Sequence, residues 1–377
     1  MSRFARLALY SPFAALAVTA AAGTAAARPS YGDGELLAPI GAQAHVCEGQ
    51  ATCNGGFPEG IVVVDDRVYV SGPANFGTAG KGPSVVTVLQ RSNGHQQAEI
   101  LLEGENTALE HALSGLATDG SGDVFALSTQ LGVVRLHRHG NRYEQTPYAP
   151  PLPDLPLCAP GQSAGCQPGF VDLPPLPNEM AFDGAGNLYI TDSLQATIFK
   201  VPAGGGSIAP WFSSPAFIGN LGAPLPFGTN GIKLSGDGHS LYVIETFDPA
   251  DASQSHLYQV RLRAHPTAAD LSLVATFGGG VAADSLAVGD SGKVYVSLAG
   301  SSQIAVLARD GHELTRLSGP SGSSIPYDNP AGLTFDDARK SLLVANHAIF
   351  GNPADFAVLR VYVDDRGADA GGGCGDD

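Results

Sequence analysis

Four residues that can offer oxygen ligands occupy the same position in a repeated stretch of this chain. They are Glu59, Asn178, Asn230 and Asp284, and each stands directly before a short aliphatic segment. Carboxylate and amide oxygens are the ligands that hard cations, calcium above all, prefer in proteins. No His or Cys occupies this position in any copy, which disfavours a soft-metal site. The pattern predicts a metal site, and the alternative is that Asn and Asp only cap turns before strands.

The repeated stretch occurs six times. In each copy an opening residue is followed by a small residue or an acid, an aliphatic residue, a polar spacer and a run of aliphatic and aromatic residues. The opening residues are Glu59, Ser114, Asn178, Asn230, Asp284 and Ala331. They recur at intervals of roughly 47 to 64 residues, a period typical of propellers and other repeat arrays.

Within one copy the pattern predicts four strands. In the fourth copy, residues 232–234 and 240–244 flank a tight turn of Ser, Gly and Asp, which is the signal of a hairpin. Two further strand-like segments follow at 256–260 and 271–275. Four antiparallel strands per copy make one blade, so the sequence predicts an all-β, six-bladed β-propeller.

The sixth copy has no fourth strand of its own. Its third strand is predicted at 358–363, and a Gly/Asp-rich segment follows. We expect the segment from Glu35 to Ile40 to supply the missing strand, because that closure would remove an exposed sheet edge.

The composition restricts the class of partner and the compartment. Asp and Glu outnumber Lys and Arg by 36 to 20, which argues against nucleic acid. Residues 1–27 combine a basic start, a short apolar run and an Ala-rich end, typical of a signal peptide, with an N-terminal membrane anchor as the alternative. We expect residues 28–366 to form the propeller, residues 367–377 a flexible tail, and the mature protein to be periplasmic or secreted without membrane association.

The five cysteines fit an oxidising compartment. Cys47 is close to Cys53, and Cys158 is close to Cys166, so two local disulfides are predicted. The spacings match zinc sites poorly. Cys374 lies in the predicted tail. The second pair belongs to a proline-rich insertion, residues 150–177, which we expect to lie beside the site because it leads into Asn178.

The repeat and its opening residues resemble the senescence marker protein/gluconolactonase (regucalcin-like) family. The match is carried by Glu59 after Pro58, Asn178 after Pro177, Asn230 after Thr229 and Asp284 after Ala283. The resemblance implies a propeller in which these four residues surround a divalent metal in the central channel. It also implies that Asp284 acts both as a ligand and as the catalytic base.

Two residues depart from the family pattern. Members that act on sugar lactones carry an Arg two positions before the third-blade Asn, where this chain has Leu176. The residue after that Asn is often Asp, and here it is Glu179. We therefore expect a substrate less polar than an aldonolactone.

Loops at the same mouth of the channel offer further groups. His347 is predicted as an additional proton shuttle, since histidine changes protonation near neutrality, with a packing role as the alternative. The other residues expected near the mouth are Phe76, His111, Asp192, Glu245, Phe247, Asp248 and Phe350.

Together these features predict a secreted, calcium-dependent hydrolase of a small lactone or ester. One alternative is a non-catalytic binding propeller of the NHL type. Another is a lyase or condensing enzyme like strictosidine synthase.

Overall fold

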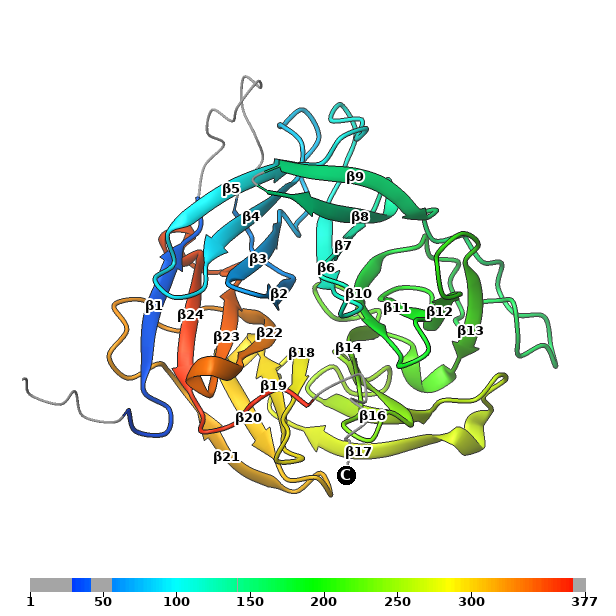
Figure 1. Ribbon diagram of the computed structural model, residues 1–377. Coiled ribbons are helices and arrows are strands. Elements are labelled where there is room, and N and C mark those ends of the chain that lie inside the picture. Colours follow the sequence, from blue (N-terminus) through cyan, green and yellow to red (C-terminus); the bar gives the residue numbers. More distant parts are fainter. Residues whose placement is uncertain (1–28, 42–55, 141, 369–377) are drawn as a thin grey trace, which may run out of the picture.

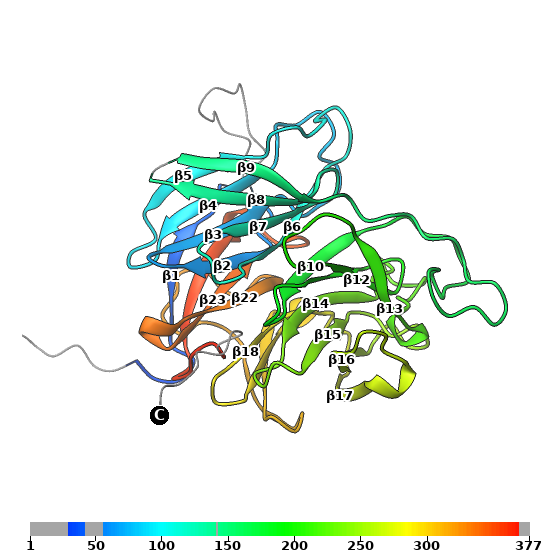
Figure 2. The ribbon, with the colours of Figure 1, turned by 45° about the vertical axis from the view of Figure 1, so that its right-hand side comes forward.

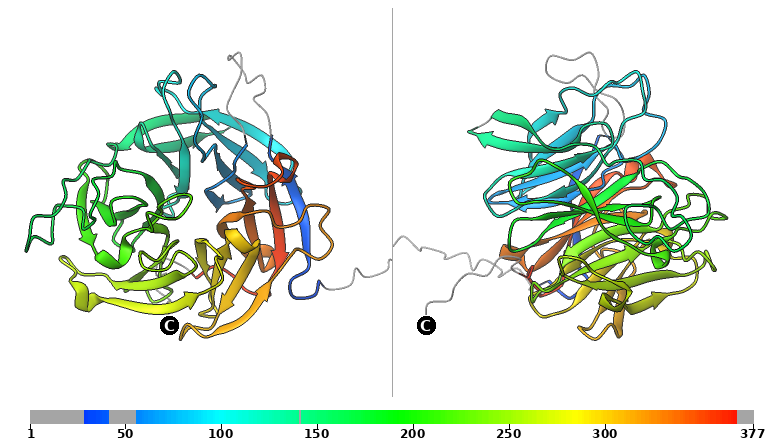
Figure 3. Two further views of the ribbon diagram at one scale, coloured as in Figure 1. Left: turned by 180° about the vertical axis from the view of Figure 1, so that it is seen from behind. Right: turned by 90° about the vertical axis from the view of Figure 1, so that its right-hand side faces the viewer.

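The structure is a computed structural model that describes residues 29–41, 56–140 and 142–368. In this part of the chain six four-stranded antiparallel sheets are arranged as blades around a central axis (Figure 1). Figure 3 shows the same ring from behind and from the side. The predicted fold class is therefore confirmed.

Blades 1 to 3 follow the chain from the innermost strand to the outermost. Blade 1 contains β2 (Ile61–Val64), β3 (Arg67–Gly72), β4 (Val85–Gln90) and β5 (Gln96–Leu101). Blade 2 contains β6 (Leu113–Ala117), β7 (Val124–Ser128), β8 (Gly132–His139) and β9 (Arg142–Ala149). Blade 3 contains β10 (Pro177–Phe182), β11 (Leu188–Asp192), β12 (Thr197–Val201) and β13 (Ala209–Ser213).

Blades 4 and 5 have the same order, and blade 6 joins the two ends of the described chain. Blade 4 contains β14 (Thr229–Leu234), β15 (Ser240–Glu245), β16 (Ser255–Arg261) and β17 (Leu271–Phe277). Blade 5 contains β18 (Ala283–Val288), β19 (Val294–Leu298), β20 (Gln303–Leu307) and β21 (Glu313–Leu317). Blade 6 contains β22 (Pro330–Asp336), β23 (Ser341–Asn346), β24 (Ala357–Tyr362) and β1 (Gly34–Pro39).

The ring is closed by the N-terminal strand. β1 pairs antiparallel with β24, with Glu35 opposite Arg360, and so forms the outer strand of blade 6. This confirms the strand predicted at Glu35 to Ile40. The closure covers the edge of β24 that would otherwise expose unpaired backbone groups.

Helical structure is limited to single turns. The described residues contain five 3₁₀ turns, at Pro215–Phe217, Ala268–Asp270, Ala299–Ser301, Asp337–Arg339 and Pro353–Asp355. Within the same residues, none of the helical segments has the length and apolar character needed to cross a bilayer.

The hydrophobic core lies in layers between neighbouring blades. On β3, Val68 and Val70 pack toward blade 6, whereas Tyr69 between them packs toward blade 2. This is the period-two alternation of a strand that is covered on both faces. Equivalent layers separate each successive pair of blades around the ring.

The proline-rich insertion carries one of the two predicted disulfides. Cys158 and Cys166 are bonded, which confirms this pair. The loop between β9 and β10 reaches outward from the ring (Figures 1 and 2). Only its last part, with Leu176, returns to the axis.

Other predictions fall on residues outside the described ranges. The signal peptide, the Cys47–Cys53 pair and Cys374 are among them. The domain boundaries at residues 27 and 366 stay predictions.

The start of the innermost strand is irregular in five of the six blades. The pairing register shifts at two consecutive residues in β6, β10, β14, β18 and β22. The first residue of each pair is the opening residue of the repeat, as with Asn230 in β14 and Asp284 in β18. Bulges of this kind change the direction of a side chain, here at three of the four predicted metal ligands, Asn178, Asn230 and Asp284.

Hydroxyl groups on the second strand bind backbone groups at the start of the innermost strand, as blades 1 and 3 show. Ser71 Oγ accepts a hydrogen bond from the Gly60 N–H (2.8 Å), and Thr191 Oγ1 accepts one from the Glu179 N–H (3.1 Å). Thr191 Oγ1 also donates to the backbone oxygen of Asn230 in the next blade (2.6 Å). In blade 3 the Thr191 hydroxyl therefore satisfies a backbone group that the bulge removes from the strand ladder.

Glycine follows the opening residue where neighbouring blades meet most closely. A Cβ atom on Gly231 would lie 2.7 Å from the Asp284 backbone oxygen and 2.7 Å from Ser285 Cα. These are main-chain atoms of the next blade, which cannot move aside as a flexible side chain could.

Substitution of Gly231 by Ala therefore tests the close approach of blades 4 and 5. We expect Gly231→Ala to destabilise the protein by about 2 kcal/mol or more, because overpacking against fixed backbone is costly. Gly278→Ala is the matched control, since a Cβ there meets nothing within 4 Å. Chemical denaturation of both variants would contradict the account if Gly231→Ala were as stable as Gly278→Ala.

Candidate active site

The predicted site residues meet at one mouth of the central channel. Glu59, Asn178, Asn230, Asp284 and His347 all line a single cavity of about 330 Å³. Ser114, which opens the second copy of the repeat, lines it too. Convergence follows from the fold, because the innermost strands of all blades begin at the same end of the axis.

Asp284 is the residue of this group whose pKa is shifted furthest by its surroundings. Burial, followed by the nearby Glu59 and Glu179 carboxylates, raises the pKa of Asp284 well above its usual range. A hydrogen bond with the Asn230 side chain acts in the opposite direction. Within the described ranges of the chain, Asp284 forms no ion pair with Lys, Arg or His. Its ionised form therefore lacks a positive partner among the described side chains.

Asn230 has an oxygen that the protein does not use. Its Nδ2 donates to Thr246 Oγ1 (3.0 Å), which fixes the orientation of the amide. Its Oδ1 is buried and has no hydrogen-bond partner within the described structure. Buried polar atoms are rarely left without a partner, so this oxygen is one available to a ligand.

Glu59 and His347 form a buried pair across the junction between blades 1 and 6. His347 Nδ1 hydrogen-bonds to Glu59 Oε2. The edge of the imidazole also faces the ring of Phe57, with ring centroids 6.0 Å apart. These contacts fix the ring and leave the buried Nε2 atom of His347 without a partner among the described residues.

Glu179 is a residue whose structural role the sequence did not reveal. It occupies the second bulge position of blade 3, where blades 2, 4 and 6 have Gly. Its carboxylate accepts hydrogen bonds from the Ile232 N–H (2.9 Å) and Ser285 Oγ (3.1 Å), and it pairs with Lys233. Glu179 therefore links the innermost strands of blades 3, 4 and 5. The only sequence signal was an acid in place of Gly at this position.

Apolar side chains form the wall of the cavity. Leu176 stands at the position where the family pattern has Arg, and its backbone N–H donates to the buried Asp192 carboxylate (3.2 Å). Phe76 and Phe350 also line the cavity, with 58% and 74% of their surfaces exposed. The other apolar residues of the wall include Leu225, Phe227, Phe247 and Ile349.

Several residues expected near the mouth do not contribute polar groups there. Asp192 is buried and bonded to the Gln195 side chain (2.7 Å), so its predicted place at the mouth is wrong. Glu245 and Asp248 were also wrongly placed, because they lie outside the cavity lining and close to His256. His111 reaches the lining, but both ring nitrogens face backbone oxygens, of Leu109 (2.9 Å) and Gly82 (3.0 Å).

The donor set suits a hard cation. Two carboxylates and two amide side chains line the same cavity, and the unpartnered Asn230 oxygen is among their atoms. A divalent cation would offset the repulsion among Glu59, Glu179 and Asp284 that raises the pKa of Asp284.

Comparison with known proteins supports the resemblance at the level of family and fold. Residues 172–345 match the SMP-30/Gluconolactonase/LRE-like region, a stretch that contains Asn178, Asn230 and Asp284. No curated protein has a sequence that matches this chain.

Two solved structures share the fold over most of the chain. The calcium-binding protein regucalcin from Agrobacterium tumefaciens is 17% identical, with a TM-score of 0.56 over 89% of this chain and 95% of that one. A presumed gluconolactonase is 14% identical, with a TM-score of 0.51 over 88% and 94% of the two chains. The expected resemblance is thereby confirmed for residues 172–345, which match the SMP-30/Gluconolactonase/LRE-like region within a six-bladed propeller.

Proposed function

We propose that this protein is a divalent-metal-dependent hydrolase of small lactones or esters that carry an apolar group. The observation that carries the proposal is the Asp284 carboxylate, which has no cationic partner in residues 29–41, 56–140 and 142–368. It shares the cavity with Glu59 and with the Asn230 oxygen that lacks a hydrogen-bond partner in the same ranges. The family match and the regucalcin and gluconolactonase folds support a lactonase.

Four residues would hold the metal: Glu59, Asn178, Asn230 and Asp284. Calcium is the cation that best suits a site of oxygen ligands alone. Bound there, it would polarise a substrate carbonyl and make a water molecule more acidic. The carboxylate of Asp284 would accept the proton of the attacking water. Secretion to the periplasm or the medium remains part of this proposal.

His347 would move a second proton. Its Nδ1 is held by Glu59 Oε2, so the Nε2 atom is the one left for exchange with a substrate or water. A carboxylate that fixes the tautomer and orientation of an imidazole in this way is a common arrangement in catalytic pairs. Glu59 would thus position His347 as well as bind metal.

The apolar wall supports the choice of substrate. Leu176 cannot donate the hydrogen bonds that an Arg would give to sugar hydroxyls. The aromatic and aliphatic side chains around it gain free energy when an acyl or aryl group covers them. An aldonolactone would leave its hydroxyl groups unpaired against this wall, which costs binding energy.

The charge on Asp284 predicts how the stability of the metal-free protein depends on pH. Because its pKa is raised in the folded state, ionisation destabilises the fold as pH rises above about 4, the ordinary pKa of Asp. We expect Asp284→Asn to unfold at a higher temperature than wild type at pH 8 in the presence of a chelator, and at about the same temperature at pH 4.

Calcium should reverse this order at pH 8, since it stabilises only a protein that binds it. Thermal melts at both pH values, with chelator and with calcium, would make the comparison. Equal melting temperatures of the two proteins at pH 8 in chelator would contradict the electrostatic account.

Activity gives the direct test of the function. On a panel of aryl esters, acyl lactones and aldonolactones, we expect turnover of the apolar members, its loss with chelator and its return with calcium. Asp284→Ala should lower kcat by about 100-fold or more, the usual contribution of a general base. Leu176→Arg should raise kcat/KM for the aldonolactones relative to kcat/KM for the apolar substrates.

Other outcomes point to the alternatives. Full activity of the chelated enzyme would refute the role of the metal. Tight ligand binding without turnover would favour a binding propeller, and product analysis that finds elimination or condensation instead of hydrolysis would favour a lyase or condensing enzyme.

A further inference from the structure

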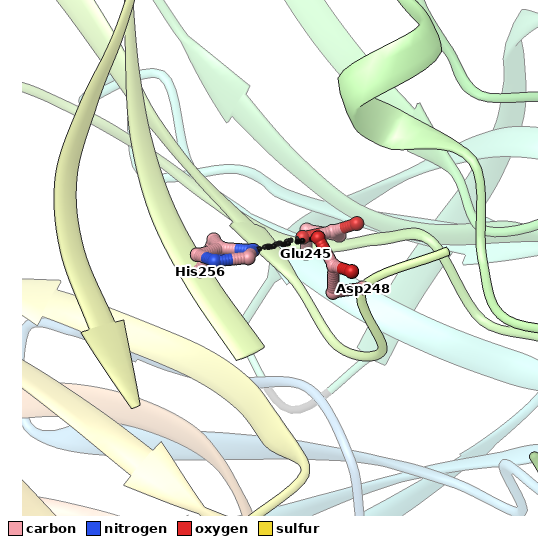
Figure 4. A group of neighbouring side chains, drawn as sticks. All are labelled: Glu245, Asp248 and His256. Carbon is pink, nitrogen blue, oxygen red and sulfur yellow. Dashed lines mark hydrogen bonds and ion pairs between the residues drawn. The ribbon is translucent and has the colours of Figure 1, made fainter. Parts of the chain in front are cut away.

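Three metal-binding side chains meet in blade 4, away from the lining of the central cavity. Glu245 is the last residue of β15, and His256 lies directly opposite it on β16. Asp248 lies in the loop that joins these two strands. Figure 4 shows the three side chains turned toward one another, and we call them the blade-4 triad.

The distances within the triad suit a shared ligand. His256 Nδ1 lies 2.6 Å from Glu245 Oε2 and 3.7 Å from Asp248 Oδ2. One possible ligand atom from each residue lies within 4.8 Å of the other two. Tetrahedral ligands that lie about 2.0–2.2 Å from one ion are about 3.3–3.6 Å from one another. The Asp248–His256 distance already suits such a site, and an ion would replace the hydrogen bond between Glu245 and His256 with a slightly wider separation.

Glu245 supplies the second observation that points to a ligand. Its side chain is completely buried, yet Oε1 has no hydrogen-bond partner within the described structure. In the same part of the chain, neither Glu245 nor Asp248 forms an ion pair with Lys or Arg. A buried carboxylate in this situation is costly unless a positive charge offsets it.

The electrostatics of the triad agree with this geometry. Burial, with a smaller contribution from Asp248, raises the pKa of Glu245 to about 9. Burial also lowers the pKa of His256, which favours the neutral imidazole that binds metals. Tyr258, the next residue on this face of β16, has its pKa raised to about 12 by burial and by the same two carboxylates.

One of the two carboxylate oxygens of Asp248 accepts the backbone hydrogen bonds of its loop. Oδ1 accepts hydrogen bonds from the backbone N–H groups of Ala250 (2.8 Å) and Asp251 (2.9 Å), which shape the loop. Oδ2 takes no part in these two hydrogen bonds and lies 3.7 Å from His256 Nδ1. The side chain is 23% exposed, so the triad can be reached from solvent.

The triad also connects the two loops that form part of the cavity wall. The backbone oxygen of Asp248 accepts a hydrogen bond from Asn220 Nδ2 (2.8 Å), which joins the loop after β15 to the loop before β14. Phe247 from the first loop and Phe227 from the second line the central cavity. An ion that fixes Asp248 would therefore make both loops more rigid.

We propose that Glu245, Asp248 and His256 form a second metal site, which takes a zinc-like transition ion and stabilises the wall of the cavity. A nitrogen ligand beside two carboxylates favours zinc or a related ion over calcium, which prefers oxygen ligands alone. The proposal is independent of the hydrolase function, because it rests on residues outside the cavity lining.

Zinc titration of the metal-free full-length protein tests the proposal. Asp248→Asn is the key variant, since an Asn retains the oxygen that caps the loop and loses the second carboxylate oxygen. His256→Gln is a second variant, and Asp284→Asn is the matched control in the central channel. Calorimetry would give the affinity and stoichiometry for zinc, and thermal melts would show that each variant is folded.

We expect Asp248→Asn and His256→Gln to weaken zinc binding by about 100-fold or more, as loss of a direct ligand should. Zinc should raise the melting temperature of wild type and of Asp284→Asn, but not that of the two triad variants. Cobalt in place of zinc should give visible absorption bands in wild type that are lost in His256→Gln. Absence of zinc binding by wild type, or equal binding by Asp248→Asn, would overturn the proposal.

Discussion

The close approach of the innermost strands around the axis is the constraint on which the rest of the structure depends. Blades 4 and 5 approach so closely that a single Cβ on Gly231 would overlap the backbone of Asp284 and Ser285. At the same point the strand pairing shifts, and Thr191 Oγ1 connects blade 3 to the backbone of blade 4. The bulges occur at Asn178, Asn230 and Asp284, which line one cavity, so the same geometry closes the ring and builds the site.

That geometry also concentrates negative charge. The carboxylates of Glu59, Glu179 and Asp284 influence one another within the channel, and only two of them have a basic partner in the described structure. Lys233 offsets Glu179, and His347 pairs with Glu59. Asp284 is left with a raised pKa, a state that is unfavourable in an empty site and favourable once a cation binds. In the proposed function, the affinity for a cation would follow from this local instability of the metal-free protein.

The sequence was sufficient to predict the parts of the fold that repeat along the chain. Six copies of one strand pattern predicted the blades, and the missing strand of the last copy predicted the closure by β1. The gathering of Glu59, Asn178, Asn230 and Asp284 in one cavity also followed from their common position. Residues at and after the end of β15 were less predictable. Glu245 faces His256 because the two are paired across a hairpin, and Asp248 lies beside them in the connecting loop, whose shape the repeat does not determine. The role of Glu179 depended on its contacts with the two following blades, which one sequence does not reveal.

A crystal structure of the protein grown with calcium would test the central claim most directly. The account predicts one strong, calcium-specific anomalous peak within coordinating distance, about 2.3–2.6 Å, of oxygens from Glu59, Asn178, Asn230 and Asp284. The Asn230 oxygen that now lacks a partner should be among the ligands. A structure at saturating calcium with no ion in the channel, or with the ion bound elsewhere and these four side chains unchanged, would contradict it.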